Sequence, residues 1–441
     1  MKKTYLYTLL VLLGFTAGCK KDEDPIFDDP DTRVAAALAE NQAQLLSAPN
    51  GWKATIYPIG GKGFTYYLKF SADGKVNMLS DFNSTTTTAL NESTYRLKAL
   101  QRPTLIFDTY NYMHLPADPD ANVSGGANAT GLKSDFEFAF ASVAGDTLNM
   151  EGIFNFNLMK MVKLTAAQSQ AILAGGFKTM IEANAAYLTA NKNPYIQLAT
   201  NVRGSVLIDP LTKTLRLNYL DANDVSLAQT VTFAYDVEKL TLSNYVTYGN
   251  MRFNELFWDA NNKTYYFMSG ANRVNVQNST TPIIPLRTLF VPGGRDYSQI
   301  DYNPLTVATN QSADFNTRYN ACRTGLAAVG NANRVLDNVR IIMNTDNTML
   351  LRFYYRNTAG TAFQANFTYS YALANGIYTF TYMAADGNAG VVGGGLASLR
   401  DYFSNNTFRV DWVTNPSGGA SYGGFYTVAN PASFFYGTLI R

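Results

Sequence analysis

The segment Phe64-Thr65-Tyr66-Tyr67-Leu68-Lys69-Phe70 decides the fold class, together with the Asp73-Gly74 turn and residues 76–80 that follow it. Aromatic and β-branched residues favour strands, and Asp-Gly between two such segments is a strong hairpin signal. The whole chain has the same character, because aromatic residues make up 13% of its 441 residues and charged residues only 15%. We therefore predict a mostly β fold.

The regions on either side of this hairpin extend it into a first β unit. Residues 32–47 have apolar side chains at helical spacing, Asp31 or Thr32 can cap the helix, and Pro49-Asn50-Gly51 ends it. Alternating apolar residues predict more strands before and after the hairpin. These strands are 52–57, 95–99, 104–108, 136–140 and 147–152.

The same order of helix, hairpin and alternating strands recurs twice. Helices are predicted at 166–191 and around 314–329, and turns resembling the one at 71–76 occur at 209–215 and 344–349. Alternating aromatic strands follow, and the second and third units carry Phe257-Trp258 and Val410-Asp411-Trp412 near their ends. The alternative is coincidence, because alternation and such turns are common to β-rich chains. The three predicted turns are 71–76, 209–215 and 344–349, and the aromatic strands that follow them are 95–97, 233–235 and 367–371.

These patterns predict a mostly β fold with a few helices (α+β). The units are expected to be tandem antiparallel β-meanders or lipocalin-like barrels, each preceded by a helix, because a chain this long divides into several cores. The predicted organisation is a signal peptide at 1–18, an acidic tether at 19–31, and β units at 32–164, 165–303 and 304–441.

The N-terminus has the layout of a bacterial export signal. Lys2 and Lys3 precede a mostly apolar run at 5–15, and Ala17-Gly18 lie directly before Cys19. The run is too short to span a bilayer. The arrangement resembles a lipoprotein signal, in which Cys19 becomes the lipidated first residue of the mature chain. The alternative is an ordinary secretory signal with a coincidental cysteine.

The charged cluster Lys20-Lys21-Asp22-Glu23-Asp24 suggests where the anchored protein faces. It resembles the export signal that sends Bacteroidota lipoproteins to the cell surface. Residues 20–31 are also rich in Asp and Pro, so they are expected to form a disordered tether. We expect a lipid-anchored outer-membrane protein at the cell surface, with a periplasm-facing lipoprotein as the alternative.

Six motifs of the first unit carry a resemblance to a known family: 51–54, 66–70, 73–76, 93–98, 105–111 and 134–138. With the lipoprotein start, they resemble Bacteroidota surface lipoproteins catalogued as domain of unknown function 4302, most clearly over residues 1 to about 165. The resemblance implies association with outer-membrane nutrient-uptake systems and a binding role. It brings no established catalytic residues.

Composition excludes several chemistries and partners. Without its first 18 residues the chain loses two of its 35 basic residues and balances its 33 acidic ones, so no nucleic-acid partner is expected. His114 is the single histidine, which excludes any multi-histidine metal site. With Cys19 lipidated, Cys322 has no cysteine left to pair with, and an inert buried thiol is expected there. We predict no cofactor and no metal.

Carboxylates keep one enzymatic alternative open. Asp108 and Asp135 flank the long loop 111–133, and a polysaccharide hydrolase needs two such groups across the scissile bond. Residues 118–122 have oxygen ligands at alternate positions, as calcium loops do, but lack the glycine and distant glutamate of such a loop, so an ordinary acidic turn is expected. Other candidate carboxylates are Glu137, Asp259 and Asp411.

Aromatic residues are the main candidates for ligand contact, because their flat faces suit sugars and extended peptides. We predict Tyr110, Tyr112, Trp258 and Trp412 as ligand-binding residues, and the loops 111–133 and 384–396 as the contact surface. The expected function is non-enzymatic binding or scaffolding in nutrient acquisition or envelope assembly. Expected partners are the outer membrane, a glycan or peptide ligand, and an outer-membrane protein. The alternatives are a carboxylate-dependent hydrolase and a structural or adhesive surface protein without a small ligand.

Overall fold

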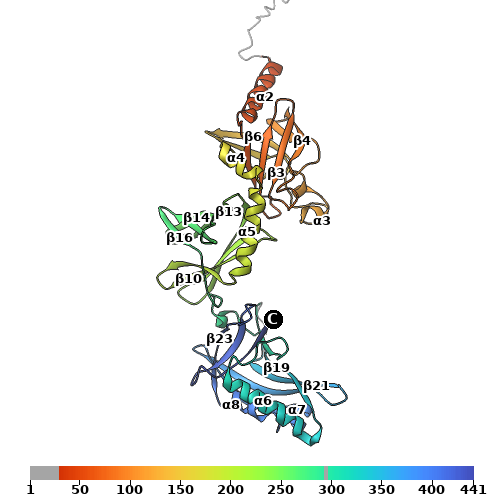
Figure 1. The fold of residues 1–441 in the computed structure, drawn as a ribbon, viewed down its shortest axis with the longest axis vertical. Coiled ribbons are helices and arrows are strands. Elements are labelled where there is room, and N and C mark those ends of the chain that lie inside the picture. Colours follow the sequence, from red (N-terminus) through yellow and green to blue (C-terminus); the bar gives the residue numbers. More distant parts are fainter. Residues whose placement is uncertain (1–28, 293–295) are drawn as a thin grey trace, which may run out of the picture. The chain divides into compact units, whose positions relative to one another are not determined.

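The computed structural model describes residues 29–292 and 296–441, and Figure 1 shows its course. The predicted signal peptide and the lipidation site at Cys19 lie outside the described residues. Contacts divide the chain into two compact units. One holds residues up to 170 except 61–65 and 83–88, and these two segments group with residues 171–441 in the other. The predicted mostly β class is confirmed, because the described residues form three antiparallel sheets in succession along the chain.

The first sheet is a closed barrel of eight strands in sequence order. It closes where the first strand pairs with the eighth, from Trp52 opposite Lys163 to Ile56 opposite Met159. The buried indole of Trp52 donates to the Leu45 carbonyl oxygen (2.8 Å) and ties the preceding helix to the barrel. The elements are α2 (Pro30–Leu46), β1 (Trp52–Ile56), β2 (Phe64–Phe70), β3 (Lys75–Ser80), β4 (Asn91–Ala99), β5 (Pro103–Phe107), η1 (Leu115–Ala117), α3 (Ala121–Ser124), β6 (Glu137–Ala144), β7 (Thr147–Gly152) and β8 (Leu158–Lys163).

The second sheet has nine strands, and the strands at its two ends, β16 and β17, belong to one nearly continuous segment. β16 pairs with β15 and β17 pairs with β9, and only Val276 separates β16 from β17. One stretch of chain therefore joins both ends of the sheet. The elements are α4 (Ala166–Leu173), α5 (Gly176–Ala190), β9 (Pro194–Ala199), β10 (Val202–Asp209), β11 (Thr214–Leu220), β12 (Ser226–Tyr235), β13 (Lys239–Tyr248), β14 (Met251–Asp259), β15 (Thr264–Ser269), β16 (Asn272–Asn275) and β17 (Gln277–Asn278).

The prediction of one helix over 166–191 is wrong. Two helices, α4 and α5, occupy this stretch and are separated at Gly175, whose φ of +91° lies in the left-handed region. Such a backbone interrupts a right-handed helix and is tolerated by glycine.

Helix α5 is hydrogen-bonded to two strands of the second sheet. The buried Asn184 of α5 donates to the hydroxyl of Tyr235 on β12 (2.9 Å) and accepts from the hydroxyl of Tyr265 on β15 (2.7 Å).

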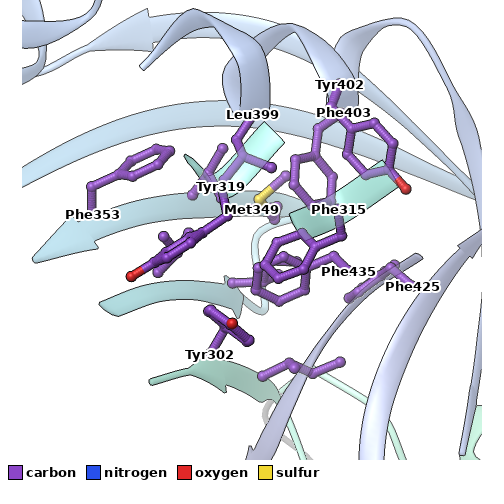
Figure 2. Packing of buried hydrophobic residues seen from close by; sticks show 14 of the residues in the cluster. Tyr302, Phe315, Tyr319, Met349, Phe353, Leu399, Tyr402, Phe403, Phe425 and Phe435 are labelled. Carbon is purple, nitrogen blue, oxygen red and sulfur yellow. The ribbon is translucent and has the colours of Figure 1, made fainter. Parts of the chain in front are cut away.

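The third sheet is a second closed barrel of eight strands. Its core is aromatic, and Phe315 of α6 lies among Tyr302, Phe425 and Phe435 (Figure 2). The elements are η2 (Leu286–Thr288), β18 (Gln299–Tyr302), α6 (Ala313–Ala328), η3 (Val329–Asn331), β19 (Val335–Met343), β20 (Thr348–Arg356), β21 (Ala362–Ala374), β22 (Ile377–Ala385), α7 (Gly387–Val392), α8 (Ala397–Ser404), β23 (Thr407–Val413), β24 (Tyr422–Thr427) and β25 (Phe434–Ile440).

The third barrel departs from the predicted order in one respect. β18 precedes α6 and pairs with both β19 and β25, so the expectation that a helix comes first is wrong here, and a unit starting at 304 leaves β18 out. This strand has only four residues, too few to show alternation. The three turns predicted to correspond all join the second and third strands of their sheets: β2 to β3, β10 to β11 and β19 to β20.

Candidate functional site

The two ends of the first barrel differ in the length of their connections. Because the strands are antiparallel, residues 57–60 and the connections 108–136 and 153–157 all lie at one end, which we call the loop end. Short turns at 71–74, 100–102 and 145–146 lie at the other end. Helix α2 lies beside that second end, where Pro30 and Val34 line one pocket with Ala99 and Leu100, while α3 belongs to the loop end (Figure 1).

Asp135 organises the loop end. Its buried carboxylate accepts four hydrogen bonds, all from the connection between β7 and β8. The backbone N–H groups of Phe154 (3.0 Å) and Asn155 (2.8 Å) donate to Oδ1. The backbone N–H of Asn157 (3.1 Å) and its side-chain Nδ2 (2.7 Å) donate to Oδ2. Bonds to a buried charged acceptor are stronger than neutral ones, so this carboxylate fixes the loop.

Neighbouring contacts reinforce this arrangement. Asn157 Oδ1 accepts from the backbone N–H of Ile59 (3.0 Å), and Nδ2 of the same side chain also donates to the Lys133 carbonyl oxygen (2.8 Å). Asp135 packs so closely on Gly152 that a Cβ there would lie 2.1 Å from the carboxylate oxygen. Only glycine fits at that position without displacing Asp135. Three of the long connections are thus joined by one polar network.

The loop that this network fixes displays apolar side chains to solvent. Phe154 is 87% exposed and Phe156 is 68% exposed, and Phe156 has a φ of +58°, a conformation unusual for an aromatic residue. Ile59, Phe136 and Leu158, which belong to or border the connected loops, are exposed as well. We call these five residues, Ile59, Phe136, Phe154, Phe156 and Leu158, the apolar loop patch.

A pocket of about 590 Å³ adjoins the patch, within the size range of ligand-binding clefts. Phe136 and Phe154 line it together with polar groups, among them Thr130, Lys133 and Glu137. The pocket therefore combines an apolar wall with polar groups at its border.

Tyr110 and His114 extend the aromatic surface from Phe136. The His114 ring stacks on Phe136 (centroids 4.5 Å apart) and on Tyr110 (5.6 Å). The Tyr110 hydroxyl donates to Asp118, which keeps the pKa of Asp118 below its usual value. Burial and the same hydrogen bond raise the pKa of Tyr110 to about 12. Of the four predicted ligand-binding residues, Tyr110 is the one whose ring lies in this site and is largely exposed.

The other three predicted residues hold parts of the fold together. The Tyr112 hydroxyl donates to the Ala89 carbonyl oxygen (2.9 Å), and burial raises its pKa. Trp258 packs edge-on against Tyr265 of the second sheet (5.1 Å). The Trp412 indole donates to the Ile284 carbonyl oxygen (2.7 Å), which ties the segment before the third barrel to β23. Each side chain has a packing or bonding role that accounts for its position.

The two predicted contact loops differ from each other. Residues 111–133 form part of the loop end as expected. Residues 384–396 instead fold into α7 and the turn after it, with Ala389 and Val392 buried and Asp386 capping the helix through the Ala389 N–H (2.7 Å). The second loop therefore packs Ala389 and Val392 against the third barrel, while Val391 of the same helix is exposed.

The carboxylates proposed for a hydrolase have other partners. Asp108 forms an ion pair with Arg96 (2.8 Å), and both oxygens of Asp135 are occupied by the four donors described above. Asp259 pairs with Arg273, while hydrogen bonds from Asn262 and Arg273 hold its pKa below the usual value. In the predicted acidic turn, Asp120 caps α3 by accepting from the Asn122 N–H (2.8 Å). Burial raises the pKa of the Cys322 thiol to about 11, so it is unreactive at neutral pH.

The described residues contain neither a metal site of clustered ligands nor a membrane-spanning helix. Within 29–292 and 296–441, no group of three or more His, Cys, Asp or Glu side chains is placed to hold a metal ion. In the same part of the chain, no helix has the length and apolar character to cross a bilayer.

Sequence reasoning missed Phe154 and Phe156. The alternation Ile153-Phe154-Asn155-Phe156-Asn157 reads as another strand, which would bury one set of side chains. Two asparagines flanking an aromatic residue between strands are the signal that could have indicated a turn instead.

These features define a class of β-rich protein built from successive antiparallel sheets, with exposed apolar side chains on the loops of the first barrel. The chain belongs to the family described as Domain of unknown function (DUF4302), which it matches over residues 23–260, more than half of its length. That range includes the whole first barrel and the loop end. No curated protein sequence matches the chain.

One solved structure shows a weak likeness, the isotype 1 transferrin binding protein B of serogroup B Neisseria meningitidis. The two chains are 9% identical, and the match covers 88% of this chain and 76% of the other. The TM-score of 0.13 is too low to carry any argument about this protein.

The single histidine gives a direct test of the aromatic stack. Burial lowers the pKa of His114 below the usual histidine value of about 6.5, although a backbone hydrogen bond involving Phe107 acts in the opposite direction. The unfolded chain therefore binds the proton more tightly, so stability is complete above about pH 6.5 and falls as the pH drops toward the lower folded pKa. We expect the His114 Hε1 proton to titrate in NMR spectra below 6.5 in the folded protein and near 6.5 in urea. A folded midpoint at or above 6.5 would contradict the stack, and His114→Gln should remove the signal.

Proposed function

We propose that this protein is a lipid-anchored outer-membrane lipoprotein, exposed at the cell surface, with a binding role in nutrient acquisition or envelope assembly. The observation that carries the proposal is the apolar loop patch, held in place by the buried carboxylate of Asp135. A folded chain rarely exposes such a group of large apolar side chains without a partner for them. The arrangement gives the loop end a rigid contact surface.

The anchor is part of the same proposal. Cys19 follows an apolar run and two small residues, as in lipoprotein signals, and Pro30 begins helix α2 eleven residues later. We place the lipid on Cys19 and the three sheets outside the membrane. The charged residues 20–24 support a position at the cell surface.

The proposed role is not enzymatic. A two-carboxylate hydrolase needs both groups free to exchange protons or attack the substrate. The Asp135 oxygens are instead filled by donors of the 153–157 loop, and Asp108 is held by Arg96. We therefore favour binding over polysaccharide hydrolysis for the loop end.

The two cysteines provide a matched test of the anchor. We expect radiolabelled palmitate to be incorporated into the wild-type chain and into Cys322→Ser in bacterial cells, but not into Cys19→Ser. The unlabelled variant should also leave the outer-membrane fraction. Palmitate on Cys19→Ser would overturn the proposed anchor, and protection of the wild-type chain from protease added to intact cells would overturn surface exposure.

The binding role is tested on the chain from residue 19 onward, with Cys19→Ser to keep it soluble. We expect saturable binding in a screen of glycans and peptides, with no product formed in the same wells. If the wild-type chain forms a cleavage product and the Asp108→Asn variant does not, the hydrolase alternative would be established instead.

A further inference from the structure

We propose that the apolar loop patch docks an apolar segment of a partner protein, with the adjoining pocket receiving one of its large side chains. This inference rests on the proposed binding role and names the class of partner. The patch combines the two kinds of residue found at protein interfaces: exposed apolar side chains, and the polar Thr130, Lys133 and Asn155 in the adjoining pocket.

The chemistry of the side chains favours a protein over a sugar. Sugar recognition combines stacking on a ring with hydrogen bonds from polar groups around it. The five patch residues have no polar side-chain atom, and the polar Thr130, Lys133 and Glu137 lie in the adjoining pocket. The nearby tyrosine hydroxyls are already engaged, that of Tyr110 with Asp118 and that of Tyr112 with the Ala89 carbonyl oxygen. The patch therefore offers burial of apolar surface as its main source of affinity.

The loop is organised before any partner binds. Asp135 fixes the N–H groups on both sides of Phe156, and this contact holds that residue in its left-handed conformation. A surface that is already ordered loses less conformational entropy when it binds. Aromatic side chains displayed on a rigid support are typical of the residues that dominate binding energy at interfaces.

Closure of the first barrel defines how the partner docks. Pairing of β1 with β8 leaves no free strand edge in this sheet, so a partner cannot add a strand to it. Contact at the loop end must therefore come from side chains packing into the patch and the pocket.

A displayed library of random peptides is the probe for this proposal. The chain from residue 19, carrying Cys19→Ser, is the bait, and the affinity of selected peptides is measured by titration calorimetry. We expect peptides with two or more large apolar side chains. Their dissociation constant should rise roughly tenfold or more for Phe154→Ser/Phe156→Ser, as for aromatic residues at the centre of an interface. Asp135→Asn should weaken binding as well, although it keeps all five apolar side chains.

The control is Leu305→Ser, which removes a side chain 91% exposed in another part of the chain and should leave the affinity unchanged. Both phenylalanines are exposed, so urea unfolding should show that the double variant folds normally. Failure to enrich any peptide, or equal affinity for the double variant, would overturn the proposal. So would patch-dependent binding to phosphatidylglycerol vesicles or to glycans, or a patch-dependent dimer in sedimentation. The palmitate-labelling experiment tests the lipid anchor separately, and its result does not depend on whether the patch binds a peptide.

Discussion

Replacing Asp135 with asparagine is expected to destabilise the first barrel by about 2–4 kcal/mol, because two buried donors lose their acceptor. An asparagine can offer one carbonyl oxygen to Phe154 and Asn155, but its NH₂ group then faces the two donors of Asn157. The side chain keeps its size, so the loss reports the hydrogen bonds rather than the packing. The 153–157 loop should lose its fixed conformation first.

The three tryptophans allow this change to be measured in the first barrel alone. Trp52, Trp258 and Trp412 lie one in each sheet, on β1, β14 and β23. In a Trp258→Phe/Trp412→Phe background, fluorescence during urea unfolding reports on the surroundings of Trp52. Asp135→Asn should lower the transition midpoint. The same background tests whether Trp258 and Trp412 contact ligand, since we expect peptide binding to survive it.

Asp108→Asn is the matched control for this experiment. It removes the same charge from the same loop end, but the Asp108–Arg96 pair is partly exposed, with side-chain exposures of 32% and 49%. Exposed ion pairs contribute about 0–1 kcal/mol, so only a small change is expected. Equal effects of the two substitutions would contradict the organising role of Asp135.

Phe315→Ala is expected to destabilise the third barrel by about 3–5 kcal/mol, the usual loss when a buried phenylalanine leaves a cavity. The Phe315 ring is fully buried and meets Tyr302 (4.7 Å between centroids) and Phe435 (5.3 Å) edge-on (Figure 2). It also meets Tyr436 edge-on, with the ring centroids 5.4 Å apart. Such contacts add to the area that the ring buries. The measurement is urea unfolding followed by Trp412 fluorescence in a Trp52→Phe/Trp258→Phe background.

Phe154→Ala is the matched control, because it is the same substitution at a side chain that is 87% exposed. It should change the unfolding midpoint of the first barrel very little. If Phe154→Ala were as destabilising as Phe315→Ala, Phe154 would be a packing residue and the apolar loop patch would lose its interpretation as a contact surface.

The sequence was most informative where local signals were strong. The Asp73-Gly74 turn and the alternation around it placed β2 and β3 within a residue of their observed bounds. The prediction of one helix over 166–191 was wrong because the helical spacing of apolar residues continues across Gly175. The left-handed backbone of that glycine separates α4 from α5. β18 could not be predicted from the sequence, because four residues are too few to show the alternation of a strand. It is a strand because it pairs with β19 and β25, which lie far along the chain.

The candidate site was harder to predict from the sequence, because the exposure of a side chain depends on contacts with residues far along the chain. Asp135 was correctly singled out as a carboxylate beside the long loop, but it bonds residues about twenty positions further on. That bonding turns Phe154 and Phe156 outward, whereas Trp258 and Trp412 found partners within their own part of the fold. Residue type alone favoured tryptophan and tyrosine over phenylalanine as ligand contacts.

Hydrogen exchange of the 153–157 loop tests most directly whether the loop end is rigid and exposed at once. We expect the amide protons of Phe154, Asn155 and Asn157 to exchange slowly in the wild-type chain, although the neighbouring aromatic side chains are open to solvent. In Asp135→Asn the same amides should exchange quickly while those of β1 and β8 remain protected. Fast exchange of the three amides in the wild-type chain would show that Asp135 does not fix this loop.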